Sequence, residues 1–304
     1  MKNLVVTGGL GHIGSRLIPH LLEKGHKVYC IDNLSTQRFV SLRGLLQNPN
    51  FAFYQFDLNK NSESIEKNLH DHKVDCIIHL AAITDAEGSH GKAEEVHQNN
   101  FNSTKNIVQF CNQHDVKLIF PSSTSVYGTS ESEVYEDEER FLNPQSPYAE
   151  SKINEEMHIK QNLTSKYNIL RFGTIFGVSP GMRFHTAVNK FCWQAALSQP
   201  ITVWKTALEQ YRPYLEINDA CDAVSFFLNA KYDGETFNIL TKNYTVKDII
   251  ETIQQHKDID IQFVESKIMN QLSYFVKNEK VNAAGFEVSG NLNDAIQDTF
   301  DWLG

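Results

Sequence analysis

Short apolar runs alternate with helix-like segments through the first half of the chain, and this alternation constrains the fold more than any other feature. Strands separated by helices pair in parallel, and a parallel sheet needs helices on both faces. Right-handed crossovers then lead to a doubly wound α/β fold. The predicted strands are residues 3–7, 27–31, 51–56, 74–80, 116–120 and 168–172.

The first predicted strand runs directly into a glycine-rich turn that opens the first predicted helix. Gly8, Gly11 and Gly14 form a G-x-x-G-x-x-G pattern there. Glycine lets the chain turn tightly, lets the backbone approach a pyrophosphate, and lets the helix pack closely on the sheet. The helix N-terminus offers free N–H groups to the phosphates. An ordinary glycine-rich turn is the alternative, but the strand before and the helix after favour a dinucleotide site that includes His12 and Ile13.

Asp32 ends the second predicted strand, 18 residues after Gly14. A carboxylate at this place accepts hydrogen bonds from the ribose hydroxyls of adenosine and repels a 2′-phosphate, so we expect NAD rather than NADP. Arg38 lies nearby and alone would favour the phosphate, whereas the strand end holds Asp32 in place. The alternative for Asp32 is a turn or helix-cap residue. The other expected cofactor contacts are Asn33, Asp57, Leu58, Leu80, Ala81, Ala82, Asn100 and Ser122.

The composition excludes several classes of protein. The net charge of −9 repels phosphate backbones, which argues against nucleic-acid binding. The five cysteines form no close pair with metal-ligand spacing, which favours a reducing cytosol over a disulfide framework, and the histidines are too scattered to predict a metal site. No stretch approaches the roughly 18–20 apolar residues of a membrane span. We therefore expect a cytoplasmic protein that binds neither nucleic acid nor membrane.

The regular alternation weakens after the predicted strand that ends at Phe172, and glycine and proline cluster soon after it. With 304 residues the chain exceeds the roughly 100–200 residues of a typical domain, so a second lobe is expected. We predict a dinucleotide-binding domain over residues 1–172, rejoined by about residues 212–232, and a smaller α+β substrate lobe over residues 173–304. Helices are predicted over residues 13–23, 92–113, 220–230 and 246–256.

A second motif places a phenol and an amine one helical turn apart. Tyr148 and Lys152 form a Y-x-x-x-K pattern, and residues four apart share one face of a helix. The positive charge of Lys152 beside the phenolate is expected to lower the pKa of Tyr148. A phenol with a lowered pKa serves as a general base near neutral pH. Because the pattern is common by chance, its weight depends on the segments that accompany it.

Two further segments accompany this motif in a fixed order. Residues 122–128 read SSTSVYG after a predicted strand, and residues 100–104 read NFNST within the longest predicted helix. With the glycine turn, Asp32 and the Tyr148–Lys152 pair, they resemble the extended short-chain dehydrogenases/reductases over roughly residues 1–230. Within that family the resemblance is to the NAD-dependent nucleotide-sugar epimerases, similar to UDP-glucose 4-epimerase. It implies a Rossmann-type sheet with a C-terminal substrate lobe.

The resemblance implies roles for individual residues. Tyr148 would remove the proton of the sugar C4 hydroxyl while hydride passes to NAD, and hydride would return to the opposite face of the 4-keto sugar. Ser123 would hydrogen-bond the reacting oxygen, and Lys152 would also bind the nicotinamide ribose. Asn100 would support the helix and the strand end beside the site. By the same analogy the protein would form a homodimer through a four-helix bundle.

The resemblance also ranks related reactions. The 4,6-dehydratases carry Asp-Glu where this chain has Thr124-Ser125, and the decarboxylases carry Glu in place of Ser125, so both reactions are disfavoured. A ketoreductase needs no added acid and stays open, although Asp32 argues mildly against its usual NADPH. A non-catalytic NAD-binding regulator is disfavoured because it has no need of the proton-transfer residues.

The family pattern also points to contacts with a nucleotide sugar. Arg212 matches the arginine that grips the pyrophosphate, since a guanidinium binds phosphate oxygens bidentately. Thr174 occupies a place where the family often has Asn. Asp85 and Glu87 are expected to be solvated loop acids, and Asp219 an N-cap. The expected substrate contacts are Ser123, Thr174, Arg183, Asn189 and Arg212, with a structural or surface role as the alternative for the last three.

Overall fold

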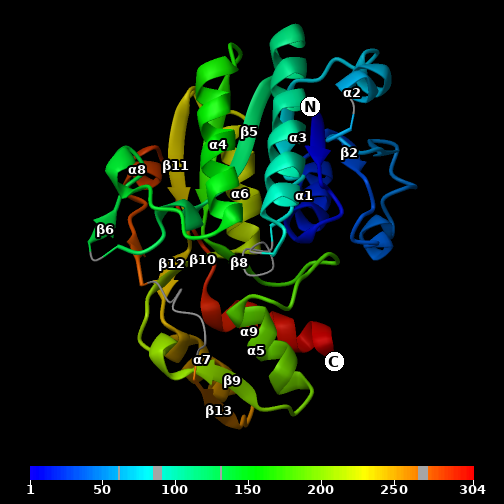
Figure 1. Ribbon diagram of the computed structural model, residues 1–304. Helices are drawn as coiled ribbons and strands as arrows, with labels where there is room; N and C mark the ends of the chain where they lie inside the picture. Colours follow the sequence, from blue (N-terminus) through cyan, green and yellow to red (C-terminus); the bar gives the residue numbers. More distant parts are fainter. Residues whose placement is uncertain (61, 85–90, 131, 266–272) are drawn as a thin grey trace.

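The computed structural model describes residues 1–60, 62–84, 91–130, 132–265 and 273–304. In this part of the chain, the centre of the fold is a seven-stranded parallel sheet with the order β11-β7-β5-β4-β1-β2-β3 (Figure 1). The strand order reverses between β1 and β4, which is the switch point of a doubly wound sheet. The predicted Rossmann-type α/β class is therefore confirmed. The strands are β1 (Asn3–Thr7), β2 (Lys27–Asp32), β3 (Phe51–Gln55), β4 (Cys76–His79), β5 (Lys117–Ser123), β7 (Tyr167–Phe172) and β11 (Glu235–Ile239).

The strands are apolar on both faces because helices cover both faces. Along β1, Leu4 and Val6 pack into one core and Val5 packs into the other. This two-sided burial is why the strands appear in the sequence as nearly continuous apolar runs. The first core is covered by α1 (His12–Glu23) and α6 (Ile217–Phe227), and the second by α2 (Ser62–Leu69), α3 (Ala93–His114) and α4 (Pro147–Asn162) (Figure 1).

A smaller lobe lies beyond the carboxyl ends of the sheet strands (Figure 1). Its core joins apolar side chains of α5, α7 and α9 to those of β9. The sheet β12-β10-β8 and the pair β13-β9 complete it, and β14 pairs with β6. The lobe elements are β8 (Thr174–Phe176), α5 (Ala187–Ala196), β9 (Ile201–Trp204), β10 (Arg212–Glu216), β12 (Lys242–Tyr244), α7 (Val246–His256), β13 (Ile261–Val264) and α9 (Leu292–Leu303). The other described elements are β6 (Glu133–Val134), β14 (Phe275–Val276), α8 (Glu279–Ala283), which places Val281 in the first core, and the short 3-10 helices η1 (Phe39–Leu42), η3 (Thr124–Tyr127), η4 (Glu139–Phe141) and η5 (Lys205–Ala207).

One sheet strand, β11, was not among the predicted strands. Its sequence ETFNI has no apolar run, because Thr236 and Asn238 are polar although both are buried. The Asn238 amide is satisfied inside the protein by Tyr127 Oη at 2.6 Å and by Glu136 Oε2 at 3.1 Å. β11 pairs with β7 and follows in the chain after α6, whose apolar side chains pack into the first core.

The expected N-cap of α6 is wrong by three residues. Glu216 caps the helix by accepting hydrogen bonds from the N–H groups of Asn218 at 2.7 Å and Asp219 at 3.2 Å. Asp219 instead accepts from the N–H groups of Ser289 at 2.8 Å and Gly290 at 3.0 Å. The Asp219 carboxylate therefore ties the segment before α9 to the first turn of α6.

Three features of the described residues bear on the class of protein. No helix among them has the length and apolar character needed to cross a bilayer. No group of three or more His, Cys, Asp or Glu side chains in this part of the chain is arranged to hold a metal ion. All five cysteines are buried free thiols.

Candidate active site

A cleft of about 1150 Å³ lies where the carboxyl ends of the sheet strands meet the smaller lobe. Both parts of the chain contribute to its walls, as expected for a cofactor on the sheet and a substrate on the lobe. Asn100 and Asn189 are the predicted site residues that do not line it. The predicted residues that do are Gly8, Gly11, His12, Ile13, Gly14, Asp32, Asn33, Asp57, Leu58, Leu80, Ala81, Ala82, Ser122, Ser123, Tyr148, Lys152, Thr174, Arg183 and Arg212.

The glycine turn forms a cradle that no larger residue fits. Gly8 has a φ of +61°, and an added Cβ would lie 2.7 Å from Cα and N of Ala81 at the end of β4. A Cβ on Gly14 would lie 2.5 Å from Cα of Gly9. Gly11, the N-cap of α1, offers no side chain to the free N–H groups of that helix. The open helix N-terminus at the cleft therefore fits the pyrophosphate of a dinucleotide.

Asp32 braces the cradle and keeps acceptor capacity for a ribose. Its two oxygens accept from the N–H groups of Leu10 at 3.1 Å and Leu34 at 2.8 Å. Each carboxylate oxygen retains a lone pair that can accept from a hydroxyl. Arg38, which alone would favour the 2′-phosphate of NADP, donates from Nη1 to the carbonyl of Gly181 at 2.9 Å. With Arg38 held by this carbonyl, the acidic residue at the end of β2 fits the adenosine ribose of NAD.

His12 is a neutral residue of the cradle. Its Nε2 lies 3.2 Å from the carbonyl oxygen of Gly177, and because a carbonyl only accepts, Nε2 carries the proton. Burial lowers the pKa of His12 to about 4, with the Gly177 hydrogen bond opposing it, so the ring is uncharged at neutral pH. His12 therefore links the cofactor cradle to the loop that begins the smaller lobe.

The Ser123 hydroxyl is oriented by its neighbour. Ser123 is the last residue of β5. Its Oγ accepts one hydrogen bond from the N–H of Ser125 at 3.1 Å and another from the Oγ of Ser125 at 2.8 Å. Because these two donors occupy its acceptor sites, the Ser123 hydroxyl is left to donate its proton, and in this structure Tyr148 accepts it. The sequence motif pointed to Ser123 but not to Ser125, which sets the direction of its hydrogen bond.

Tyr148 and Lys152 lie on α4 one turn apart, as predicted. The helix begins where Ser146 caps it by accepting from the N–H of Ala149 at 3.2 Å. Lys152 lowers the pKa of the phenol as expected, but it does not set the net direction. Burial raises the pKa of Tyr148 above its ordinary value of 10, and this outweighs the lowering by the Lys152 ammonium and by the hydrogen bond from Ser123. Positive charge added beside the phenolate would lower this pKa.

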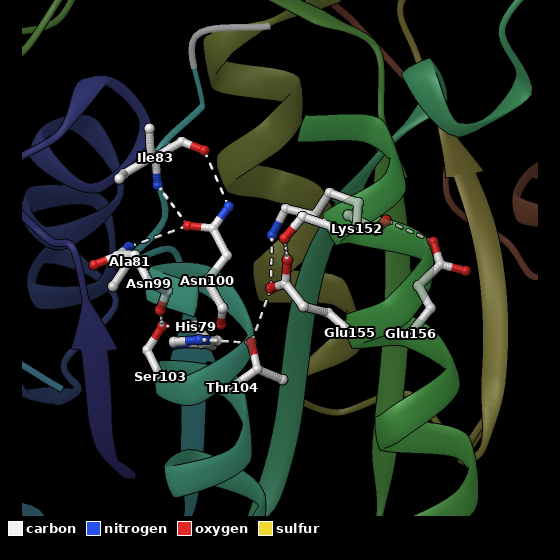
Figure 2. A network of polar contacts seen from close by, with 12 residues as sticks. His79, Ala81, Ile83, Asn99, Asn100, Ser103, Thr104, Lys152, Glu155 and Glu156 are labelled. Carbon is white, nitrogen blue, oxygen red and sulfur yellow. Dashed lines mark hydrogen bonds and ion pairs between the residues drawn. The ribbon is translucent and has the colours of Figure 1, made fainter. Parts of the chain in front are cut away.

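Asn100 and Asn189 hold the walls of the cleft from behind. Asn100 clamps Ile83, accepting from its N–H at 2.8 Å and donating to its carbonyl at 3.1 Å, as Figure 2 shows. Asn189 accepts from the N–H of Gly177 at 3.1 Å and donates to the carbonyl of Arg183 at 3.1 Å. Both amides are fully buried and bound to backbone. In this structure they position segments that line the cleft.

The lobe side of the cleft is basic in a chain whose net charge is −9. Arg212 begins β10, Thr174 begins β8, and Arg183 hydrogen-bonds Thr84 beyond the end of β4. Asp85 and Glu87 lie outside the described residues. Lining residues that the sequence analysis missed are Thr84, Ser125, His185, Lys190, Trp204, Tyr214 and Tyr274. Apart from Ser125, which lies inside the serine motif, they come from segments with no motif.

The comparison with known sequences identifies the family but not one reaction. A profile of the NAD dependent epimerase/dehydratase family matches residues 4–239. The chain is 26% identical over 317 aligned residues to the trifunctional UDP-glucose 4,6-dehydratase/UDP-4-keto-6-deoxy-D-glucose 3,5-epimerase/UDP-4-keto-L-rhamnose-reductase of Arabidopsis thaliana. That alignment covers 99% of this chain and 47% of the relative, so the chain spans about half the length of that protein.

Solved structures share the whole fold. The UDP-N-acetylglucosamine 4-epimerase of Methanobrevibacter ruminantium M1, in complex with UDP-N-acetylmuramic acid, has a TM-score of 0.88 and 25% identity, covering 99% of this chain and 97% of that one. The UDP-glucuronic acid 4-epimerase of Bacillus cereus, in complex with UDP-glucuronic acid and NAD, has a TM-score of 0.88 and 25% identity, covering 99% and 98%. With the sheet, the glycine cradle and the Tyr148–Lys152 helix, the profile match shows that this chain belongs to the NAD-dependent epimerase/dehydratase family.

Proposed function

We propose that the protein is an NAD-dependent epimerase that inverts C4 of a sugar linked to a nucleoside diphosphate. Bound NAD supplies the hydride acceptor of the oxidation and the hydride donor of the return step. The chain's own task is to orient the sugar, to move one proton, and to retain the ketone until the hydride returns.

The observation that carries this proposal is the chemistry of the wall around Tyr148. That wall offers the hydroxyls of Ser123, Ser125 and Thr174, which donate and accept hydrogen bonds but do not protonate a leaving group. In the described residues, the acids that line the cleft are Asp32, Asp57 and Glu95, on β2, in the turn after β3 and in the first turn of α3. Eliminating water from a sugar needs an acid for the departing hydroxyl. A proton-neutral redox inversion needs only a base and hydrogen bonds.

In the proposed reaction Tyr148 takes the proton of the C4 hydroxyl as that carbon loses hydride. The Ser123 proton, directed into the cleft by Ser125, hydrogen-bonds the oxygen that becomes the ketone. Lys152 supplies positive charge beside the phenolate and would also bind the nicotinamide ribose. When hydride returns to the other face of the sugar, Tyr148 gives its proton back to the oxygen, and the enzyme regains its starting state.

The basic side of the cleft supports a diphosphate as the handle of the substrate. Arg212 and Lys190 line it with Arg183, and a guanidinium binds phosphate oxygens bidentately. Anchoring the diphosphate leaves the sugar free to present either face to the cofactor. The two structural relatives were solved with UDP-linked sugars, which favours this substrate class.

The test is to incubate the purified protein with a panel of UDP- and dTDP-sugars and to separate the products chromatographically. We expect a C4 epimer without net formation of NADH. Steady NADH accumulation would assign a dehydrogenase instead, and a 4-keto-6-deoxy product would assign a dehydratase. In the same assay Tyr148→Phe is expected to lose at least about 100-fold in turnover, since it lacks the proton-transfer group, and to bind NAD like wild type.

A further inference from the structure

Helix α4 carries two consecutive carboxylates that are buried, and they have different partners. Glu155 is 0% exposed and Glu156 is 2% exposed. Glu156 forms a bidentate pair with Arg171 of β7, with N–O distances of 3.0 and 2.7 Å. Glu155 instead lies 3.3 Å from Nζ of Lys152, the amine assigned to the reaction. Glu156 also accepts from Oγ of Ser122, so it joins α4 to β5 and β7, whereas Glu155 contacts the amine of the proton-transfer pair.

Hydrogen bonds connect Glu155 through Thr104 to His79, as Figure 2 shows. Thr104 Oγ1 donates its single proton to Glu155 Oε2 at 2.8 Å, so at 3.2 Å it must accept from Nε2 of His79. His79 Nδ1 then lacks a proton and accepts from Thr7 Oγ1 at 2.7 Å. Burial, aided by Lys152, lowers the pKa of His79 to about 3, so this ring is neutral.

The other contacts of Glu155 have the same polarity. Ser151 Oγ donates to Oε1 at 3.0 Å, and Lys152 donates to Oε2. Thr104, Ser151 and Lys152 thus all donate to the Glu155 carboxyl group, and donors on both of its oxygens favour the charged form. A chain of oriented donors from β1 through β4 and α3 ends on this charge.

This carboxylate bears on the phenol through Lys152. It holds one Nζ proton, while the ammonium also rests 4.4 Å from the ring centroid of Phe120. The charged groups that face Tyr148 are Lys152 and Glu155 of its own helix and Arg183 of the lobe, and Ser123 of β5 adds a hydrogen bond. A negative charge next to the amine partly cancels the field that the amine exerts on the phenolate.

We propose that Glu155 is a positioning residue for the reaction: it holds the Lys152 ammonium beneath the cleft and weakens the positive field at the Tyr148 phenol. Without Glu155, the full charge of Lys152 would act on the phenol and make it a base at lower pH. The inference rests on the function proposed above for Tyr148 and Lys152.

The experiment is an absorbance titration of the Tyr148 phenolate in the NAD-loaded protein, taken as the difference between each variant and the same variant with Tyr148→Phe. Glu155→Gln keeps the shape and removes the charge. We expect its Tyr148 midpoint to fall by about one pH unit, which is roughly tenfold more phenolate at a fixed pH below both midpoints. The acid limb of kcat/KM should move in the same direction.

Glu156→Gln is the matched control, because it removes the same charge one residue away but from the partner of Arg171. We expect that variant to unfold more readily and to keep the wild-type Tyr148 midpoint. Glu155→Asp keeps the negative charge but places it farther from Nζ of Lys152, so it should lower the Tyr148 midpoint by a smaller amount. This variant replaces Glu155→Gln as the test if the Gln variant fails to fold. An unchanged midpoint in both Glu155 variants, or an equal shift in the Glu156 variant, would overturn the proposal. Because the titration uses no sugar, its result is independent of whether the epimerase assignment holds.

Discussion

Replacing Gly8 with alanine tests the cofactor cradle most directly. Gly8 combines a φ of +61° with an approach in which an added Cβ would lie 2.7 Å from backbone atoms of Ala81. Ordinary contact begins at 3.4 Å, so the ends of β1 and β4 would have to separate by about 0.7 Å. Backbone cannot swing aside as a flexible side chain does. The glycine turn would therefore move relative to the sheet edge where the dinucleotide binds.

The size of the effect follows from two contributions. A left-handed conformation costs a residue with a Cβ about 1–2 kcal/mol, which lowers stability. A displaced N–H group loses a hydrogen bond to a charged phosphate oxygen, which is worth about 1.5–3 kcal/mol. Losing one such bond weakens NAD binding by about 10- to 100-fold.

Gly25→Ala is the matched control for this prediction. Gly25 has a φ of +78°, but a Cβ there would meet no atom within 4 Å, so the variant carries the strain without the close approach. Calorimetric titration with NAD and thermal unfolding should be run on both variants. We expect both to unfold at lower temperature and only Gly8→Ala to bind NAD weakly. If Gly8→Ala bound NAD as tightly as Gly25→Ala, the cradle would not depend on this contact.

Two other predictions follow from charged groups. Arg212→Ala should raise KM for the nucleotide sugar by about tenfold or more with little change in kcat, because the arginine binds the diphosphate equally in the ground state and the transition state. Steady-state kinetics checks this prediction, and a fall in kcat alone would contradict it. Burial raises the pKa of Glu216 to about 7 from an ordinary 4.5, so between these pH values the folded protein holds a proton that the unfolded chain releases, and stability falls as pH rises. As pH rises from 4.5 to 8, the unfolding free energy of Glu216→Gln should therefore increase relative to that of wild type by up to about 3 kcal/mol, measured by urea titration at each pH. If the difference between the two proteins did not change with pH, Glu216 would not have a raised pKa.

The fold and the cofactor end of the site were predictable because their signals are local. The strand of Asn3–Thr7, the glycines after it and Asp32 at the end of β2 are each read from a few neighbouring residues. The right-handed crossover then brings all strand ends to one edge without further information. The strand β11 escaped prediction because Thr236 and Asn238 are buried by partners elsewhere in the chain, which no local pattern reports.

The roles of individual polar residues were less predictable. Asn100 was expected to support the helix and the strand end beside the site, whereas its hydrogen bonds to Ile83 depend on where the segment after β4 passes. Glu155 lies three residues after Lys152, a spacing that permits an ion pair on a helix. The sequence does not reveal that this pair is buried, and burial is what gives the carboxylate its effect on the phenol.

The sequence by itself determined the parallel sheet, the dinucleotide turn and the one-turn spacing of Tyr148 and Lys152, because period and spacing are properties of consecutive residues. Only the tertiary structure decided that Asn100 and Asn189 bind backbone groups and that Glu155 contacts the amine of Lys152. It also set the net pKa direction of Tyr148, since desolvation outweighs a single neighbouring charge. The partners of these polar residues and the pKa of Tyr148 depend on which distant segments of the chain pack around each side chain and exclude water from it.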